Sequence, residues 1–307
     1  MTRLGWAFVA GALVWAGTAG AQVPPAIAAK VRAAGPAISM ATMGDYAAMF
    51  PKEPYPGVTV ARDLHYGPDA LQTLDVFTPA VRPARAAPVL LFVHGGGFVR
   101  GSKHTPGSPF QDNMMLWATA NGMVGVNIDY RLAPKDPWPA GVDDLASAIT
   151  WTRDNIARYG GDPARIFIWG HSAGANHVAD WVAHPDHQGP AAASVKGAIL
   201  LSPFYPMTAT AAQASPYYGA DADLQSGEKQ IQRLAASSVP IFLAGAEFDP
   251  EGFQQFRDAA HAGLDKAGRH IGYVYLKDHG HIDEGLAVGT PDVGLTGPLL
   301  QWIRAQK

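Results

Sequence analysis

Apolar residues occur in short runs that alternate with longer amphipathic stretches along most of the chain. Residues 59–66 and 71–77, separated by Gly-Pro-Asp, predict an antiparallel hairpin at the start of a sheet. Further strands are predicted at residues 89–93, 124–129, 165–169, 198–201, 241–244 and 271–276. Helical patterns separate most of these strands, such as the one at 142–159 before Gly160. This alternation predicts an α/β fold with a mostly parallel sheet, flanked by helices and carrying active groups at the carboxyl ends of its strands.

The 307-residue chain is long enough to bury one large core, and no low-complexity linker divides it. We expect a catalytic domain over residues 58–307, with a small cap inserted at 202–238. Residues 22–57 combine a short helical pattern with prolines, and we expect this segment to pack over the active-site mouth.

The first residues have the pattern of a secretory signal peptide. Arg3 precedes an apolar run, and small residues lead to Ala19-Gly-Ala21, so cleavage before Gln22 is expected. Residues 1–21 therefore predict export to the periplasm or the medium, with no membrane anchor after processing. The chain has no cysteine, so an exported protein would be stabilised by its core alone.

The net charge of −3 provides no basic face for nucleic acid. We therefore expect a small-molecule substrate, recognised by shape and a few polar groups. Charged residues make up only 16% of the chain, beside 34 glycines and 25 prolines, which favours an enzyme rich in ordered loops.

A serine between two glycines follows the apolar run at residues 165–169. Gly170, Ser172 and Gly174 form a Gly-x-Ser-x-Gly pattern with a strand before it and a helix after it. Such a turn strains the backbone of the serine, and the following helix N-terminus offers N–H groups to an anion. Ser172 is therefore the predicted nucleophile, with a structural turn as the alternative.

A second glycine-rich turn follows the strand at residues 89–93. His94 is followed by three glycines, whose backbone can approach a substrate closely and aim N–H groups at a developing oxyanion. Gly96, Gly97 and Ala173 are the predicted oxyanion donors. We interpret His94 as a residue that orients the loop. No Lys-Ser/Thr pair follows the glycines, which disfavours a phosphate-binding loop.

An acid and a base are expected after the nucleophile, at the ends of later strands. Asp249 follows the strand at 241–244, and His281 follows the strand at 271–276. Asp249 would orient the imidazole of His281, which would move the serine proton. Glu247 is the alternative acid and His279 the alternative base.

A metal site using His279, His281 and Asp283 is only weakly supported, because a His-x-His pair without cysteine or helical spacing is poor evidence for a metal. No metal and no cofactor are predicted.

Aromatic residues near these motifs are candidates for substrate contact. Phe98 follows the glycine loop directly, and Tyr217 and Tyr218 lie in the 202–238 insertion. The alternative for the two tyrosines is that they anchor the insertion to the sheet. We expect Asp143 or Asp144 to cap its helix or to pair with Arg131.

Taken together, the motifs resemble those of the α/β-hydrolase carboxylesterases, nearest to the branch that includes hormone-sensitive-lipase-like enzymes and bacterial feruloyl-type esterases. The matching stretches lie within residues 58–304 and are His94-Gly-Gly-Gly97, Tyr130-Arg-Leu-Ala-Pro134, Trp138-Pro-Ala-Gly-Val-Asp-Asp144, Gly160-Gly-Asp-Pro163, Gly170-His-Ser-Ala-Gly174, Glu247-Phe-Asp249 and His281. The resemblance implies an α/β-hydrolase fold, a triad of Ser172, Asp249 and His281, and Gly96, Gly97 and Ala173 as oxyanion donors. One departure is His171, where the hormone-sensitive-lipase-like pattern commonly has an acidic residue before the serine.

The expected function is therefore that of a serine carboxylic-ester hydrolase acting on short-acyl or compact aromatic esters. The alternatives are cleavage of formamides, lactones or peptides by the same triad, or a non-catalytic binding protein on this fold.

Overall fold

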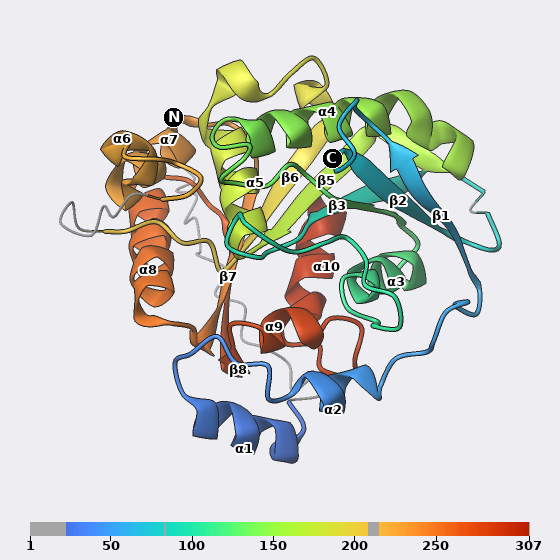
Figure 1. Ribbon diagram of the computed structural model, residues 1–307, viewed down its shortest axis with the longest axis horizontal. Helices are drawn as coiled ribbons and strands as arrows, with labels where there is room; N and C mark the ends of the chain where they lie inside the picture. The colour runs from blue at the N-terminus through green and yellow to red at the C-terminus, as the bar shows by residue number, and fades with distance from the viewer. Residues whose placement is uncertain (1–22, 83, 208–214, 307) are drawn as a thin grey trace, which may run out of the picture.

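The computed structural model describes residues 23–82, 84–207 and 215–306, and a twisted sheet lies at its centre (Figure 1). The strands are β1 (Val58–His65), β2 (Thr73–Pro79), β3 (Ala87–Val93), β4 (Val124–Ile128), β5 (Gly161–His171), β6 (Val195–Leu201), β7 (Ile241–Phe248) and β8 (Gly272–Gly280). Their order in the sheet is β1-β2-β4-β3-β5-β6-β7-β8. β2 pairs antiparallel with both β1 and β4, and all other neighbouring strands are parallel. The predicted hairpin and the mostly parallel sheet are confirmed.

The α-helices of the described residues are α1 (Pro25–Ala34), α2 (Met43–Ala47), α3 (Asp112–Ala120), α4 (Ala140–Asn155), α5 (Ala173–Ala183), α6 (Ala222–Gln225), α7 (Gly227–Ala236), α8 (Glu251–Lys266), α9 (Asp283–Leu286) and α10 (Thr296–Ala305), and the longer ones cover both faces of the sheet. Val89 and Leu91 of β3 pack in the core cluster that includes α4, α5 and α8, whereas Leu90 and Phe92 pack with α3 and α10. This two-residue alternation buries β3 on both faces, which explains its continuous apolar sequence.

Only part of residues 202–238 forms an insertion beyond the helical layer. α7 packs against α5 and α8, so it belongs to the helical layer and serves as the crossover between the parallel strands β6 and β7. The predicted cap is thus confined to the part before α7, of which residues 208–214 lie outside the described residues.

The N-terminal segment packs on the end of β8 and on α9. Val31 and Tyr46 are buried in one cluster with Leu286, and Arg32 forms an ion pair with Asp278. Residues 23–47 therefore support the loop between β8 and α9, which carries His281. The predicted signal peptide at 1–21 lies outside the described residues, and no helix within them is long and apolar enough to cross a membrane.

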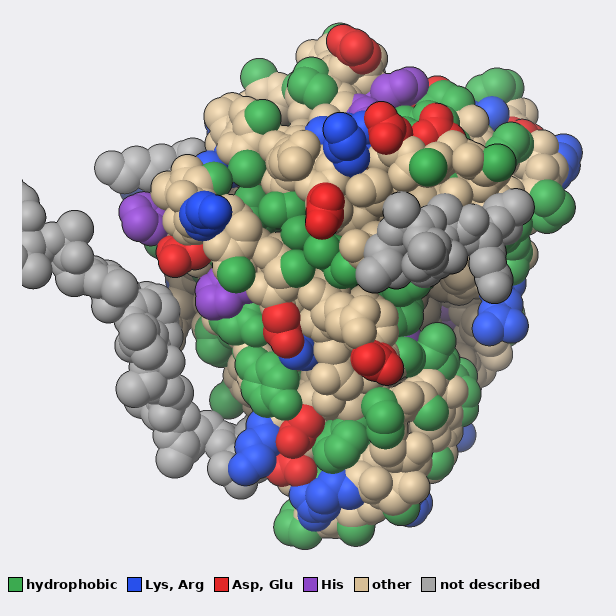
Figure 2. All heavy atoms as spheres, turned by 90° about the vertical axis from the view of Figure 1, so that its left-hand side faces the viewer, with side chains coloured by type: hydrophobic (Ala, Val, Ile, Leu, Met, Phe, Trp, Pro, Cys, Tyr) green, Lys and Arg blue, Asp and Glu red, His purple; other side chains and the backbone are tan. Residues whose placement is uncertain are grey.

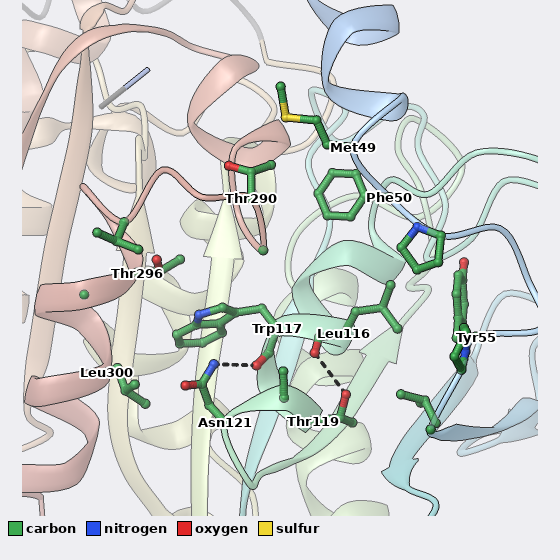
Figure 3. Close-up of a pocket in the computed structure, with 18 residues that line it drawn as sticks. Met49, Phe50, Tyr55, Leu116, Trp117, Thr119, Asn121, Thr290, Thr296 and Leu300 are labelled. Carbon is green, nitrogen blue, oxygen red and sulfur yellow. Dashed lines mark hydrogen bonds between the residues drawn. The ribbon is translucent and has the colours of Figure 1, made fainter. Parts of the chain in front are cut away.

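A hollow of about 560 Å³ lies between the second half of this segment, α3 and α10 (Figure 3). Its lining includes Phe50, Tyr55, Trp117, Thr290 and Leu300. None of the predicted triad residues lines it, so this hollow is distinct from the site that the motifs predict.

Acidic and basic side chains are interspersed on the face formed by α6, α7 and α8 (Figure 2). No broad area of one sign is visible on the described part of this face.

Candidate active site

Ser172 occupies a tight turn between β5 and α5. Its backbone has φ 55° and ψ −125°, a left-handed conformation that is unusual for a residue with a side chain. A Cβ atom at Gly170 would lie 2.1 Å from the carbonyl oxygen of Gly174, and a Cβ at Gly174 would lie 2.1 Å from that of Val93. The chain can make this turn only with glycine at both positions, which explains the Gly-x-Ser-x-Gly pattern.

The side chains of Ser172, His281 and Asp249 form a chain of hydrogen bonds. His281 Nε2 lies 2.9 Å from Ser172 Oγ, and His281 Nδ1 lies 2.7 Å from Asp249 Oδ1. Because a carboxylate only accepts, the Nδ1–H donates to Asp249 and leaves Nε2 free to accept from the serine hydroxyl. The other Asp249 oxygen accepts from the Ser202 hydroxyl at 2.6 Å and the Ala246 N–H at 2.9 Å. The structure thus brings together the three residues predicted as nucleophile, base and acid.

The alternative acid and base point elsewhere. Glu247 accepts a hydrogen bond from the Asp278 N–H at 2.8 Å. His279 is buried, with Nε2 3.1 Å from Asp292. Burial lowers the pKa of His279, but the hydrogen bond and charge of Asp292 outweigh that effect and leave the pKa raised. His279 is therefore engaged in an ion pair of its own.

The oxyanion loop is held by His94 and its neighbours. The buried His94 ring stacks on Tyr130 with centroids 4.5 Å apart, and its Nδ1 lies 2.7 Å from the Gly95 carbonyl oxygen. The Tyr130 hydroxyl donates to the His94 carbonyl oxygen at 2.9 Å. A Cβ atom at Gly95 would lie 3.0 Å from Ser172 Cβ, so the loop lies directly against the nucleophile. These contacts fit the orienting role predicted for His94.

The predicted oxyanion donors lie in the turns next to Ser172. Gly96 has φ 128° and Gly97 has φ 63°, and Ala173 is the first residue of α5. A Cβ atom at Gly96 would lie 1.9 Å from the carbonyl oxygen of Arg100, so only glycine fits there. The participation of these amides in catalysis stays a prediction.

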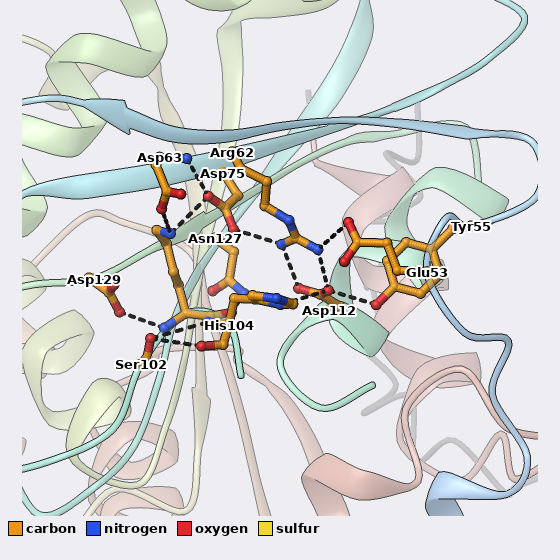
Figure 4. A network of polar contacts seen from close by, with 11 residues as sticks. Glu53, Tyr55, Arg62, Asp63, Asp75, Ser102, His104, Asp112, Asn127 and Asp129 are labelled. Carbon is orange, nitrogen blue, oxygen red and sulfur yellow. Dashed lines mark hydrogen bonds and ion pairs between the residues drawn. The ribbon is translucent and has the colours of Figure 1, made fainter. Parts of the chain in front are cut away.

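A buried lysine, Lys103, fixes the segment that follows these glycines, and its partners Asp63, Asp75 and Asp129 are labelled in Figure 4. Lys103 Nζ lies 2.6 Å from Asp63 and 2.9 Å from Asp75, and its backbone N–H donates to Asp129. Asp129 also lies 3.4 Å from His94 Nε2. Lys103 thus links the glycine loop to β1 and β2. The sequence patterns did not single it out, because an isolated lysine in a loop resembles a solvated one.

Two groups of described residues bring three possible metal ligands within 4.8 Å of one another. They are His171, His281 and Glu284, and Glu53, His104 and Asp112. Both ring nitrogens of His281 already face Ser172 and Asp249. In the second group the Arg62 guanidinium contacts both carboxylates (Figure 4). The His279-His281-Asp283 combination does not form, because His279 faces Asp292.

The prediction that Tyr217 and Tyr218 contact substrate is corrected by their burial. Tyr217 is 1% exposed and Tyr218 is 7% exposed. The hydroxyls of Tyr218 and Tyr205 donate to the buried Asp180 at 2.7 and 2.6 Å, and burial raises the pKa of Asp180 to about 7. Tyr218 therefore anchors the insertion to α5, and Tyr217 is packed in the core. Phe98 stacks on Tyr217 at 4.7 Å but remains partly exposed, so it keeps its place as a candidate for substrate contact.

Two further phenylalanines lie near His281, and one of them, Phe253, escaped prediction as a site residue. The Phe253 ring lies 4.5 Å from the His281 ring, and Phe204 packs on Phe253 at 4.9 Å with 38% of its surface exposed. A Cβ atom at Gly252 would lie 2.7 Å from the Phe204 ring, so this packing requires glycine. Phe253 comes four residues after Asp249, but this spacing indicates a position beside His281 only when the direction of α8 is known.

Arg131 and Asp144 form the salt bridge that was expected beside the site. The Arg131 guanidinium lies 2.6 Å from the fully buried Asp144, which also accepts from the Arg131 N–H at 2.8 Å. This pair fastens the loop after β4 to α4.

Comparison with known proteins places these features among esterases. Residues 90–240 match a family model described as the alpha/beta hydrolase fold. The esterase LipQ of Mycobacterium tuberculosis is 33% identical over 216 residues, which cover 69% of this chain and 45% of LipQ. The chain spans less than half the length of the mycobacterial esterases that it matches.

Solved esterase structures share the fold. A fungal esterase from Rhizomucor miehei superimposes with a TM-score of 0.66 at 22% identity, covering 92% of this chain and 97% of the fungal one. A thermostable esterase from Pseudomonas putida gives a TM-score of 0.63 at 21% identity, covering 94% and 96%.

Proposed function

We propose that this chain, which belongs to the alpha/beta hydrolase fold family, hydrolyses carboxylic esters through an acyl-enzyme formed on Ser172. The observation that supports this most strongly is the hydrogen-bonded chain from Ser172 Oγ through His281 to Asp249, at 2.9 and 2.7 Å. A nucleophile, a base within hydrogen-bonding reach and an acid that orients the base are the parts that nucleophilic acyl transfer needs.

In the proposed mechanism, His281 removes the hydroxyl proton as Ser172 attacks the ester carbonyl. The amides of Gly96, Gly97 and Ala173 stabilise the oxyanion, and His281 then delivers the proton to the departing alcohol. Water, activated by the same imidazole, releases the acid. Asp249 holds the imidazole in place and stabilises the imidazolium that forms in each step.

We propose short-acyl or compact aromatic esters as the substrates. Phe98 is the partly exposed aromatic residue next to the glycine loop, and Phe253 stands beside the base with Phe204 packed on it. Flat apolar rings such as these can pack against a short acyl chain or an aromatic acyl group of a substrate. No long apolar helix that would shelter an extended lipid chain is present in the described insertion before α7.

A chain-length series of p-nitrophenyl esters tests the substrate proposal. Each added methylene gains about 0.8 kcal/mol only while it finds apolar surface to bury against. We therefore expect kcat/KM to rise or stay level from acetate to butyrate or hexanoate and then to fall. A steady increase to dodecanoate would refute the proposal. Methyl ferulate, acetylated xylan and a formamide in the same panel separate the aromatic, carbohydrate and amide alternatives.

We also propose that the protein is exported and begins at Gln22 after processing. The support is the apolar run after Arg3 and the small residues at Ala19 and Ala21. N-terminal sequencing of periplasmic or culture-fluid protein should give Gln-Val-Pro. Material in those fractions that still starts at Met1 would contradict the proposal.

A further inference from the structure

A second carboxyl group is buried beside the catalytic pair. Glu284, in the short helix α9, has no exposed surface, and neither of its carboxyl oxygens has a hydrogen bond of good geometry among the described residues. Its closest ionisable partner is His171 Nε2, at 3.2 Å. A buried carboxyl without a strong partner costs stability, so its presence calls for an explanation.

His171 connects this carboxyl to both the nucleophile and the base. It is the residue before Ser172, and its Nε2 lies 2.8 Å from the backbone carbonyl oxygen of His281. A carbonyl oxygen can only accept, so Nε2 carries the proton and donates it to the His281 carbonyl oxygen, while a Glu284 oxygen lies 3.2 Å from the same nitrogen. The imidazole rings of His171 and His281 lie 4.9 Å apart. His171 is thus a bridge between the end of β5 and the loop that carries the base.

The surroundings of Glu284 favour its neutral form. Burial and the charge of Asp249 raise the pKa of Glu284 well above its ordinary value, and His281, the Ser202 hydroxyl and His279 offset this only in part. Burial likewise lowers the pKa of His171, so its ring is uncharged at neutral pH. Two neighbouring buried carboxyls do not readily ionise together, and Asp249 has the better hydrogen bonds to hold the charge.

We propose that Glu284 and His171 form a neutral positioning pair, which holds the His281 loop at hydrogen-bonding distance from Ser172. This inference rests on the proposed function. Neither residue touches the reacting atoms. The hormone-sensitive-lipase-like pattern has an acidic residue directly before the serine, whereas this chain has His171 there with the Glu284 carboxyl beside it. Because Glu284 is neutral, the pair adds no second negative charge beside Asp249.

The pair is tested by comparing Glu284→Ala with Glu284→Gln. Removing the carboxyl deletes its contact with His171 Nε2, so the loop that carries His281 is held less firmly. A displacement of the base by about 1 Å costs on the order of 100-fold in rate. Glu284→Ala should therefore lower kcat by roughly 10- to 100-fold with little change in KM. Glu284→Gln keeps the shape and the acceptor oxygen without a charge, so its kcat at neutral pH should stay close to that of the wild type.

The fall of kcat/KM at acidic pH, its acidic limb, follows protonation of His281, and the pH at which it occurs depends on whether Glu284 is charged. If Glu284 is neutral, Glu284→Gln leaves this limb in place. If it is ionised, removing a negative charge beside His281 should move the limb to lower pH by about one unit or more. A shifted limb, or a Gln variant as impaired as the Ala variant, would overturn the neutral pair.

Controls separate this inference from folding effects and from the proposed function. Glu247→Ala removes a carboxylate that accepts from Asp278 N–H near the end of β8, just before the His281 loop, and it should leave kcat near the wild-type value. Active sites are counted by phosphonate labelling of Ser172, and thermal midpoints are recorded for every variant. If the wild type is not labelled, the proposed function fails. If it is labelled and Glu284→Ala keeps its kcat, this inference alone fails.

A second variant keeps the test decisive if Glu284→Ala does not fold. His171→Phe retains a ring of similar size but removes the Nε2–H donor, so it should show the same loss of kcat. A folded His171→Phe enzyme with wild-type kcat would refute the pair.

Discussion

Ser172→Ala should lower kcat on the order of 10⁶-fold, the scale observed when a triad serine is removed from a related mechanism. Without the hydroxyl no acyl-enzyme can form, and His281 has no proton to accept at 2.9 Å. The residual rate should reflect only substrate binding and the oxyanion donors. Progress curves with p-nitrophenyl butyrate measure the loss, with Ser226→Ala as the matched control because its hydroxyl caps α7 by accepting from Lys229 N–H.

Chemical labelling makes the same test independent of substrate choice. A serine-directed phosphonate should add one label per molecule, and peptide mapping should place that label on Ser172. The left-handed backbone of Ser172 presents its hydroxyl above the end of the sheet, which favours reaction there. Complete inactivation with Ser172 unlabelled would show that another residue is the nucleophile.

The glycine-rich turns of the site could be predicted from sequence because their backbone geometry admits few residue types. Gly170 and Gly174 are the clearest example, since any side chain there would collide with a neighbouring carbonyl group. Buried strands such as β3 were predictable for a similar reason, because both faces must be apolar. These constraints are local, and a local constraint leaves a trace in the sequence.

Residues whose role depends on long-range packing were not predictable. Asp180 lies in the last turn of α5, where an acidic residue in the sequence resembles a surface position, yet it accepts hydrogen bonds from the hydroxyls of Tyr205 and Tyr218. Without that acceptor in view, Tyr218 looked like a pocket residue. Glu284 could have been suspected from its position three residues after His281, but its contact with His171 joins segments 113 positions apart in the chain.

The choice between the two histidines of the His-Gly-His segment is the second large-effect prediction. His281→Ala should lower kcat on the order of 10⁶-fold, because the serine hydroxyl loses its general base. His279→Ala should leave kcat near the wild-type value in the folded enzyme, since its ring faces Asp292 and the Lys277 carbonyl group. If His279→Ala is the inactive variant and His281→Ala retains turnover, the roles must be exchanged.

His279→Ala should instead reduce stability, and the reduction should depend on pH. Removing one member of a buried ion pair costs about 3–5 kcal/mol because the other charge remains uncompensated. Asp292 raises the pKa of His279 in the folded state, so the stabilisation is fully present below the unfolded pKa of about 6.5 and is lost as the pH rises through the folded value. Urea unfolding should therefore show a larger difference between wild type and variant at about pH 6 than at about pH 9. An equal difference at both values would mean that the pair is not charged in the folded protein.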